Sequence, residues 1–255
     1  MLVQFLGTGT STGVPMIGCN CEVCRSTDAR DNRLRSSVCL TIGDKNFLID
    51  CGPDFRQQML RSGIGHIDAV LLTHEHYDHT SGLDELRNFS RDNPIPIYAE
   101  PNVLEIIHQR LFYCFSEQPK PGVAHLSLNP IEALSPFRIF DIEINPVRVW
   151  HYRLPIIGYR IGNFAYITDM LTMDEEEYPR LFNLDTLVVN ALRHKPHFSH
   201  QNLESALAFI ARLAPKQAYI THMSHQIGLH AIEEKWLPSN VLFAYDGLTI
   251  SIPEE

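Results

Sequence analysis

Four potential metal ligands lie within six residues of this 255-residue chain, in the run THEHYDH at residues 73–79. The run follows an apolar segment, residues 67–72, which predicts a buried strand. Alternate side chains of an extended chain point to the same side, so His74, His76 and Asp78 would face one way. His79 would join them if the backbone turns at Asp78. A divalent cation is a natural partner for this group at a strand end.

Two other interpretations of the run are less consistent with its spacing. On a helix, residues two apart face away from each other, so His74 and His76 would not share an ion. The His-Glu-x-x-His motif of helical zinc proteases is absent from the run. A polar loop with chance histidines would leave four polar groups without partners. We therefore expect a metal site.

Composition limits the classes of protein that fit. The hydrophobic content of 44% and the length predict one large domain over residues 1–255. The net charge of −9, from 21 basic and 30 acidic residues, argues against a nucleic-acid partner. It is compatible with a small phosphorylated substrate that a few local cations hold. Thirteen clustered histidines favour metal chemistry.

The first residues carry no basic segment followed by an apolar core, so no signal peptide is expected. We find no apolar run close to the roughly 20 residues that cross a bilayer, so no membrane partner is expected. The expected location is cytoplasmic, where thiols stay reduced.

Short apolar strands alternate with amphipathic helical segments, which predicts a layered α/β domain. The two segments on either side of Asp246 and Gly247 predict a closing hairpin. Helices are expected at residues 83–88, 103–115 and 201–213. Strands are expected at residues 39–42, 46–50, 69–73, 95–99, 164–168, 186–190, 217–221, 241–245 and 248–252.

Four polar residues each follow a buried strand candidate: Asp50, His74, Asp169 and His222. One such residue is usually a turn or cap residue. Loops at the edge of a rigid sheet are the usual place for a functional site. Four of them together predict a common site.

The ordered set of residues His74, His76, Asp78, His79, His151, Asp169 and His222, with Asp50 as a first motif, resembles the metallo-β-lactamase superfamily. The fold of that superfamily is a single-domain αββα sandwich. Matching residues occur over nearly the whole chain. The resemblance implies that one ion takes His74, His76 and His151, and that a second takes Asp78, His79 and His222. Asp169 would bridge the two ions, and Asp50 would orient ligands in the second shell.

Two divalent ions about 3.5–4 Å apart can generate a bridging hydroxide and neutralise charge on the attacked group. Asp78 and Asp169 would thus serve catalysis as metal ligands. Histidine and aspartate sets accept several metals, so zinc and manganese both remain open. An anionic bridge at Asp169 resembles the phosphodiesterase, lactonase and thioesterase members and disfavours antibiotic hydrolysis.

Three of the six cysteines are closely spaced: Cys19, Cys21 and Cys24, in a loop around residues 18–25. This spacing suits thiolates that bind one structural zinc, and His225 is the candidate fourth ligand. Residues three apart on an extended chain point to opposite sides, so His222 and His225 can serve different sites. The alternatives are a metal-free cluster or an adventitious disulfide. Cys39, Cys51 and Cys114 are expected to be buried core thiols.

The cysteine motif together with His225 resembles the phosphoribosyl cyclic phosphate phosphodiesterases of phosphonate breakdown. The opening segment, residues 6–15, fits that family and also the tRNA 3′-processing nucleases. The expected activity is hydrolysis of a small, cyclic phosphate ester, and the resemblance implies pairing as a homodimer. The alternatives are a tRNA 3′-end nuclease and a non-hydrolytic relative of pyrroloquinoline quinone biosynthesis protein B.

The resemblance implies that His200 protonates the leaving group, and His197 competes for that role. A helix is expected to begin beside His200, and helix N-termini favour anions. Arg193 and Lys195 form a cationic group nearby in the sequence that would neutralise substrate phosphate.

Overall fold

The computed structural model describes residues 1–115 and 121–253. These residues form two compact units, each built from chain segments distant in the sequence. The first unit contains Met1–Gly7, Arg35–Glu132 and the chain end from Gly247; the second contains Thr8–Leu34 and Ala133–Asp246. Each unit contains one seven-stranded sheet with its own helices.

The sheet of the first unit changes from antiparallel to parallel pairing at β3. Its strand order is β14-β1-β2-β3-β4-β5-β6. Pairing is antiparallel from β14 to β3 and parallel from β3 to β6. The strands are β14 (Thr249–Ser251), β1 (Leu2–Gly7), β2 (Ser37–Ile42), β3 (Lys45–Ile49), β4 (Ala69–Leu71), β5 (Ile95–Ala99) and β6 (Leu126–Pro130).

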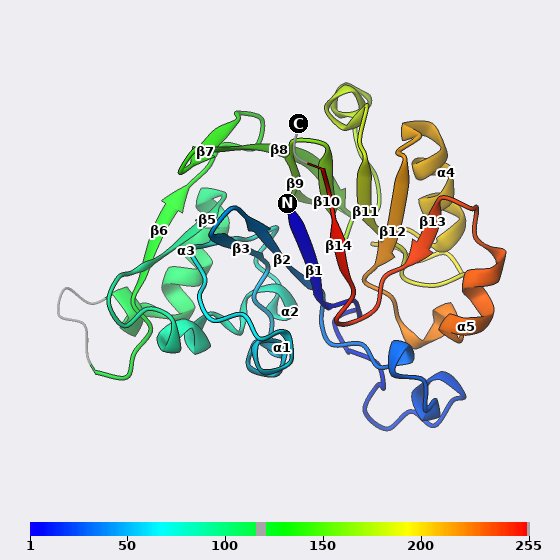
Figure 1. The fold of residues 1–255 in the computed structure, drawn as a ribbon, viewed down its shortest axis with the longest axis horizontal. Helices are drawn as coiled ribbons and strands as arrows, with labels where there is room; N and C mark the ends of the chain where they lie inside the picture. Colours follow the sequence, from blue (N-terminus) through cyan, green and yellow to red (C-terminus); the bar gives the residue numbers. More distant parts are fainter. Residues whose placement is uncertain (116–120, 254–255) are drawn as a thin grey trace. The chain divides into compact units, whose positions relative to one another are not determined.

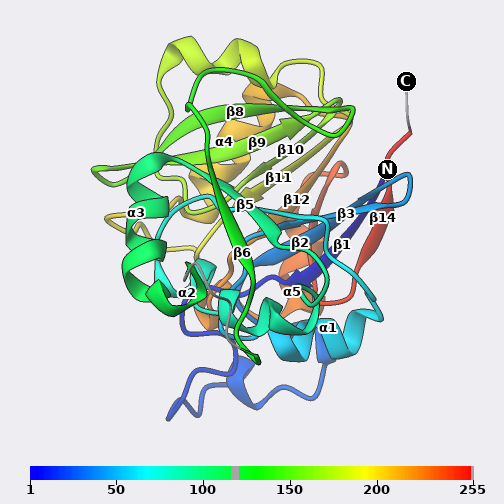
Figure 2. The same ribbon diagram turned by 90° about the vertical axis from the view of Figure 1, so that its left-hand side faces the viewer.

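The helices of the first unit pack an apolar core against this sheet. Figure 2 shows α3 beside β5 and β6, and it contacts both strands. Phe55, Leu83 and Ile107 contribute to the buried cluster that includes β4. The helices are α1 (Phe55–Ser62), α2 (Tyr77–Thr80), η3 (Leu83–Asn88), α3 (Pro101–Arg110) and η4 (Phe112–Phe115).

The sheet of the second unit has the order β13-β12-β11-β10-β9-β8-β7. Strands β10 to β13 are parallel, whereas β8 and β9 form a long antiparallel hairpin. His151 pairs with Leu154, so only Tyr152 and Arg153 form the hairpin loop. The strands are β7 (Phe137–Ile139), β8 (Ile142–His151), β9 (Leu154–Ile161), β10 (Phe164–Ile167), β11 (Thr186–Asn190), β12 (Gln217–Thr221) and β13 (Val241–Phe243).

Helix α4 (Leu203–Leu213) covers one face of this second sheet (Figure 1). The side chain of Asn202 caps it by accepting from the backbone N–H of Ser205. Its buried stripe includes Phe209 and Ile210, which pack with the side chains of β11 and β12. The other helices are η1 (Val23–Arg25), η2 (Ala29–Asp31), η5 (Glu175–Leu181), η6 (His225–Ile227), α5 (His230–Glu233) and η7 (Glu234–Trp236).

Most predicted strands are confirmed, and β5, β11 and β12 have the predicted bounds. The predicted closing hairpin is wrong, because β13 pairs with β12 and β14 pairs with β1 in the other sheet. Asp246 does mark a turn, but its carboxylate accepts hydrogen bonds from the backbone of Thr8 and Leu34.

Two of the three predicted helices are shorter than expected, and the third has the predicted bounds. The helix predicted over residues 103–115 ends at Arg110 and is followed by the short η4. Residues 83–88 form a 3₁₀ helix, and α4 begins at Leu203 rather than residue 201. Within the described part of the chain, no helix is long and apolar enough to cross a membrane.

Candidate metal centre

The first unit brings four of the predicted ligands together after β4. His74 Nε2 lies 3.0 Å from His76 Nδ1, and His79 Nε2 lies 3.2 Å from Asp78 Oδ2. The rings of His74 and His79 have centroids 4.3 Å apart. Asp78 does not continue an extended chain, as the alternation had suggested, because residues 77–80 form α2. The turn into α2 brings Asp78 and His79 onto one short helix.

Asp50 fixes the orientation of this group from a fully buried position. Its carboxylate accepts hydrogen bonds from the backbone N–H and the hydroxyl of Thr73, and from His79 Nδ1 at 2.7 Å. Burial raises the pKa of Asp50, and the neighbouring His79 opposes that shift. Because His79 Nδ1 donates to the Asp50 carboxylate, the proton of the ring is held on Nδ1, and the lone pair of Nε2 points toward Asp78.

A hydrogen bond at Nδ1 also fixes the tautomer of His74. Its Nδ1 lies 2.9 Å from Thr73 Oγ1, whose own hydrogen is donated to Asp50. The Thr73 oxygen must then accept from His74 Nδ1–H, which leaves the lone pair of His74 Nε2 facing His76. A hydrogen bond at the second ring nitrogen is the usual way in which proteins fix a metal-binding histidine tautomer.

The backbone holds α2 closely against the loop after β3. Cys51 N–H donates to the carbonyl oxygen of His79 at 2.7 Å, and Gly82 N–H donates to that of Cys51 at 2.8 Å. A Cβ at Gly52 would lie 2.0 Å from the carbonyl oxygen of Asp78. Only glycine permits this approach.

The second unit brings together His151, Asp169, His200 and His222. His222 Nε2 lies 3.2 Å from Asp169 Oδ1, and His200 Nδ1 lies 3.9 Å from Asp169 Oδ2. Ligand atoms of His151, Asp169 and His200 all lie within 4.8 Å of one another. His151 Nδ1 contacts the carbonyl oxygens of Asp169 and Ser199 at 2.9 Å each, so it carries the proton and leaves Nε2 as the ligand atom.

Two positioning residues of this second group escaped the sequence analysis. Asn190 is fully buried, and its side-chain amide bonds both the N–H and the C=O of Met170, next to Asp169. Thr168 donates its hydroxyl to Asp169 Oδ1 at 2.8 Å. An asparagine at the end of the apolar run TLVVN was the available signal, because a buried polar group requires partners.

Three of the predicted site residues have a left-handed backbone. The φ angles are 61° at Asp50, 59° at Asp169 and 55° at His222, each one or two residues past the end of a strand. Non-glycine residues rarely have positive φ, and such conformations cluster at functional sites. The sharp turn directs each side chain away from the strand direction.

His200 and the cationic group differ from the sequence-based picture. His200 lies before the cap of α4 rather than at its first turn. Burial lowers the pKa of His200 to about 3, opposed by the carboxylate of Asp169. Burial also lowers the pKa of His197. Arg193 donates to Gln226 and to two carbonyl oxygens of its own loop, whereas Lys195 is exposed.

The three loop cysteines and His225 converge within the second unit. Their four ligand atoms lie within 4.8 Å of one another, and Nδ1 of His225 lies 3.3 Å from Cys19 Sγ and 3.2 Å from Cys21 Sγ. A tetrahedral zinc would separate such sulfur and nitrogen ligands by about 3.6 Å. The pKa of Cys21 is lowered to about 6, first by the backbone N–H of Cys24 and then by His225. A thiolate at neutral pH fits a bound cation.

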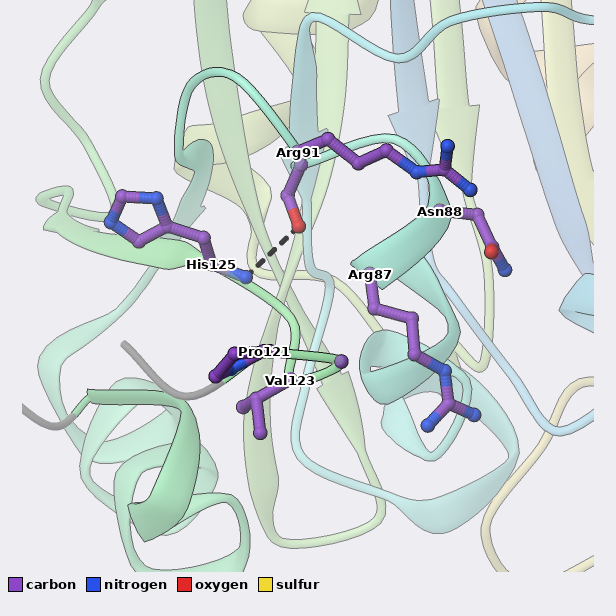
Figure 3. A pocket seen from close by; sticks show the side chains of 8 residues that line it. Arg87, Asn88, Arg91, Pro121, Val123 and His125 are labelled. Atoms are coloured by element: carbon purple, nitrogen blue, oxygen red, sulfur yellow. Dashed lines mark hydrogen bonds between the residues drawn. The ribbon is translucent and has the colours of Figure 1, made fainter. Parts of the chain in front are cut away.

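A separate cavity in the first unit has a volume of about 470 Å³ (Figure 3). Arg87, Arg91 and His125 line it, and the backbone N–H of His125 donates to Ser90 Oγ. Of the described residues around this cavity, none is a predicted ligand. Asp84 and Glu85 pair with Arg87, so the local cationic charge is largely offset.

The donor sets fit the predicted metals. Both histidine–aspartate groups present imidazole lone pairs and carboxylate oxygens, which suit zinc and manganese. The third group, three thiols and an imidazole, suits a closed structural zinc site. How the first two groups share ions stays a prediction from the family resemblance.

Comparison with known proteins shows the class of this chain. The family model of the beta-lactamase superfamily domain matches residues 45–223. The chain belongs to this superfamily, and its fold class is the metallo-β-lactamase-like αββα sandwich predicted from the sequence. This places it among the metallo-β-lactamase-fold hydrolases, which implies divalent metal ions.

Among solved structures, the chain is similar to a diphosphatase from the PhnP family. The two share 37% identity with a TM-score of 0.91, covering 98% of this chain and 96% of that one. Zn²⁺-bound PqqB from Methylobacterium extorquens, 21% identical, has a TM-score of 0.80 and covers 99% and 100% of the two chains. At 21% identity, the similarity to PqqB shows the fold alone.

The chain is also 45% identical to an octanoyltransferase of Porphyromonas gingivalis over 98% of its own length. That match covers 51% of the octanoyltransferase. The chain therefore spans about half the length of this curated relative.

Proposed function

We propose that the protein is a divalent-metal-dependent phosphodiesterase that acts on a small, cyclic phosphate ester. The observation that carries the proposal is the fixed tautomer of three histidines. Hydrogen bonds at Nδ1 of His74, His79 and His151 leave each Nε2 as a lone-pair donor. The 37% identity to a PhnP-family diphosphatase supports phosphate-ester chemistry.

The proposed ligand set is the one that the resemblance implies. One ion would take His74, His76 and His151, and the other Asp78, His79 and His222, with Asp169 bridging. When bound, the ions would activate water and neutralise charge on the phosphate. The chain's own residues would orient these ligands, through Asp50 in one unit and Asn190 in the other.

Hydrolysis adds water across one P–O bond. The water oxygen forms a new bond to phosphorus, the ester P–O bond breaks, and the leaving oxygen takes a proton. His200 and His197 are the two candidates to hold that proton. A His200→Ala variant that keeps near-normal turnover on a poor leaving group would exclude His200.

A second candidate is cleavage of a diphosphate, because the similar structure at 37% identity is a diphosphatase. The two reactions share the metals and the attack at phosphorus and differ in the leaving group. In cleavage of a diphosphate the leaving group is a phosphate. In opening of a cyclic ester the leaving group is an alkoxide, which requires a proton.

The test is a substrate panel on purified protein with quantified metal. The panel contains a cyclic phosphate, an aryl phosphodiester, a sugar diphosphate and a tRNA precursor. We expect close to three metal equivalents, two for catalysis and one in the cysteine site, and turnover of the cyclic ester. About one equivalent with no diester hydrolysis would favour a non-hydrolytic role. Preferred cleavage of the tRNA would favour the nuclease.

A further inference from the structure

Two exposed aromatic side chains lie beside the histidines of the second unit. Tyr152 directly follows His151, and Phe198 lies two residues before His200. Their rings meet edge to face, with centroids 6.0 Å apart at 81°. Tyr152 is 50% exposed and Phe198 70% exposed, so both rings present open surface to solvent. We call Tyr152 and Phe198, with Arg153, the aromatic rim.

The rim is continuous with the candidate site through a row of rings in contact. His197 contacts Phe198 at a centroid distance of 4.6 Å and His200 at 5.3 Å. His200 in turn stacks on His222 at 5.0 Å and an angle of 27°. A flat group that lies against the rim would therefore be separated from His222, which is expected to bind metal, by the rings of His197 and His200.

The backbone of Tyr152 is the second, independent observation. Its φ is 57°, in the left-handed region that bulky residues avoid. A two-residue hairpin loop with positive φ at its first residue only has the pattern of a type II′ turn, in which glycine is the usual first residue. The tyrosine here strains the turn, and strained residues cluster at functional sites.

Exposed aromatic rings alone would carry no such conclusion, since Trp236 in the same unit is 80% exposed. Phe140 in the same unit is also exposed and has a positive φ, so it is the ring contact with His197, which contacts His200, that distinguishes the rim. Arg153 adds a cation to the rim. Its guanidinium carbon lies 5.2 Å from the centre of the Tyr152 ring. Two open aromatic faces with an adjacent guanidinium suit a planar aromatic group joined to an anionic phosphate.

We propose that the aromatic rim of Tyr152, Phe198 and Arg153 is a subsite for the aromatic base of a nucleotide-type phosphate ester. The subsite rests on the proposed phosphodiesterase function and specifies its substrate class. One of the two rings would stack face to face on the base and the other, set at 81° to it, would contact the edge of the base, while Arg153 would lie against the substrate phosphate or the ring. Stacking of this kind accepts any base, because every base has a π face.

The test compares two cyclic esters that differ only in the base: adenosine 2′,3′-cyclic phosphate and methyl riboside 2′,3′-cyclic phosphate. The leaving oxygen is the same in both. For the wild-type protein we expect kcat/KM to be about tenfold higher with the base, the size of one stacking contact. Equal kcat/KM values for the two esters would overturn the proposal.

Variants then assign the effect to the rim. Tyr152→Gly should bring the ratio of the two kcat/KM values toward one while Tm stays the same or rises, because glycine relieves the strained turn. Phe198→Leu keeps apolar bulk and should also lower the ratio. Trp236→Leu is the matched control and should leave it unchanged. An unchanged ratio in both rim variants would refute the assignment.

Failure of the proposed function has a different signature. If the wild-type protein hydrolyses neither ester, the phosphodiesterase proposal fails. The rim is then tested by calorimetric titration of adenosine monophosphate. Binding that weakens about tenfold in Tyr152→Gly and Phe198→Leu, but not in Trp236→Leu, would support the base subsite, and equal binding in all proteins would exclude it.

Discussion

Replacing Asp50 by asparagine tests the link between the buried carboxylate and metal affinity. One oxygen of Asp50 accepts from Thr73 N–H at 2.9 Å, and the other from His79 Nδ1 at 2.7 Å. An asparagine would keep its oxygen at the Thr73 amide and place its NH₂ group against His79. The ring nitrogen must then accept rather than donate, which moves the His79 proton to Nε2 and blocks that lone pair.

The expected loss follows from the role of such orienting partners. Removing one typically weakens metal binding about 10- to 100-fold, or about 1.4–2.7 kcal/mol. Competition against a chelator at fixed pH measures the affinity directly, without relying on turnover. Two-dimensional ¹H–¹⁵N NMR of the imidazoles reports which nitrogen of His79 carries the proton.

Asp44→Asn is the matched control for Asp50→Asn. It removes the same charge from the same unit, at a carboxylate that is 87% exposed. We expect its metal affinity to equal that of the wild-type protein. The reasoning is refuted if Asp50→Asn binds metal as tightly as the wild type while the His79 proton remains on Nδ1.

Three further predictions concern the supporting structure. Gly52→Ala should lower the free energy of unfolding by about 1–3 kcal/mol and weaken metal binding, because its Cβ would lie 2.0 Å from the carbonyl oxygen of Asp78 in α2. Gly65→Ala is the control, because a Cβ there meets open space. Chelator competition and Tm are measured for both variants. Burial raises the pKa of Asp246 from 3.8 to about 6, so the folded protein holds a proton that the unfolded chain releases between about pH 4 and 6. The free energy of unfolding should therefore fall with rising pH across that window, by at most ~3 kcal/mol, and Asp246→Asn should flatten the slope in urea titrations. Cys21→Ser should lose one zinc equivalent per chain by elemental analysis and lower Tm, whereas Cys39→Ser should retain the zinc; full zinc content in Cys21→Ser would contradict the four-ligand site.

The sequence predicted the parts of the site that depend on local pattern. The buried strands before Asp50, Asp169 and His222 are present, and these residues follow β3, β10 and β12. Apolar runs bounded by polar residues report burial directly, because burial of each side chain is largely a local choice of residue type. The cysteine loop and His225 also come together within one unit.

Long-range contacts account for what the sequence analysis missed. The Asp246 turn looked like a hairpin, but β13 and β14 pair with strands far away in the sequence. The pairing partner of a strand edge is set by the whole sheet, so a local turn motif does not determine it. Asn190 was overlooked because its hydrogen-bond partner, Met170, is 20 residues away in the sequence.

The sequence by itself determined which groups are available for chemistry: their types, their order and their places at strand ends. The tertiary structure decided what state those groups are in. Hydrogen bonds from residues far along the chain fix the proton of His79 on Nδ1, and left-handed turns aim Asp169 and His222. These tautomers and positive φ angles are stabilised by contacts that form only on folding, so no local pattern in the sequence records them.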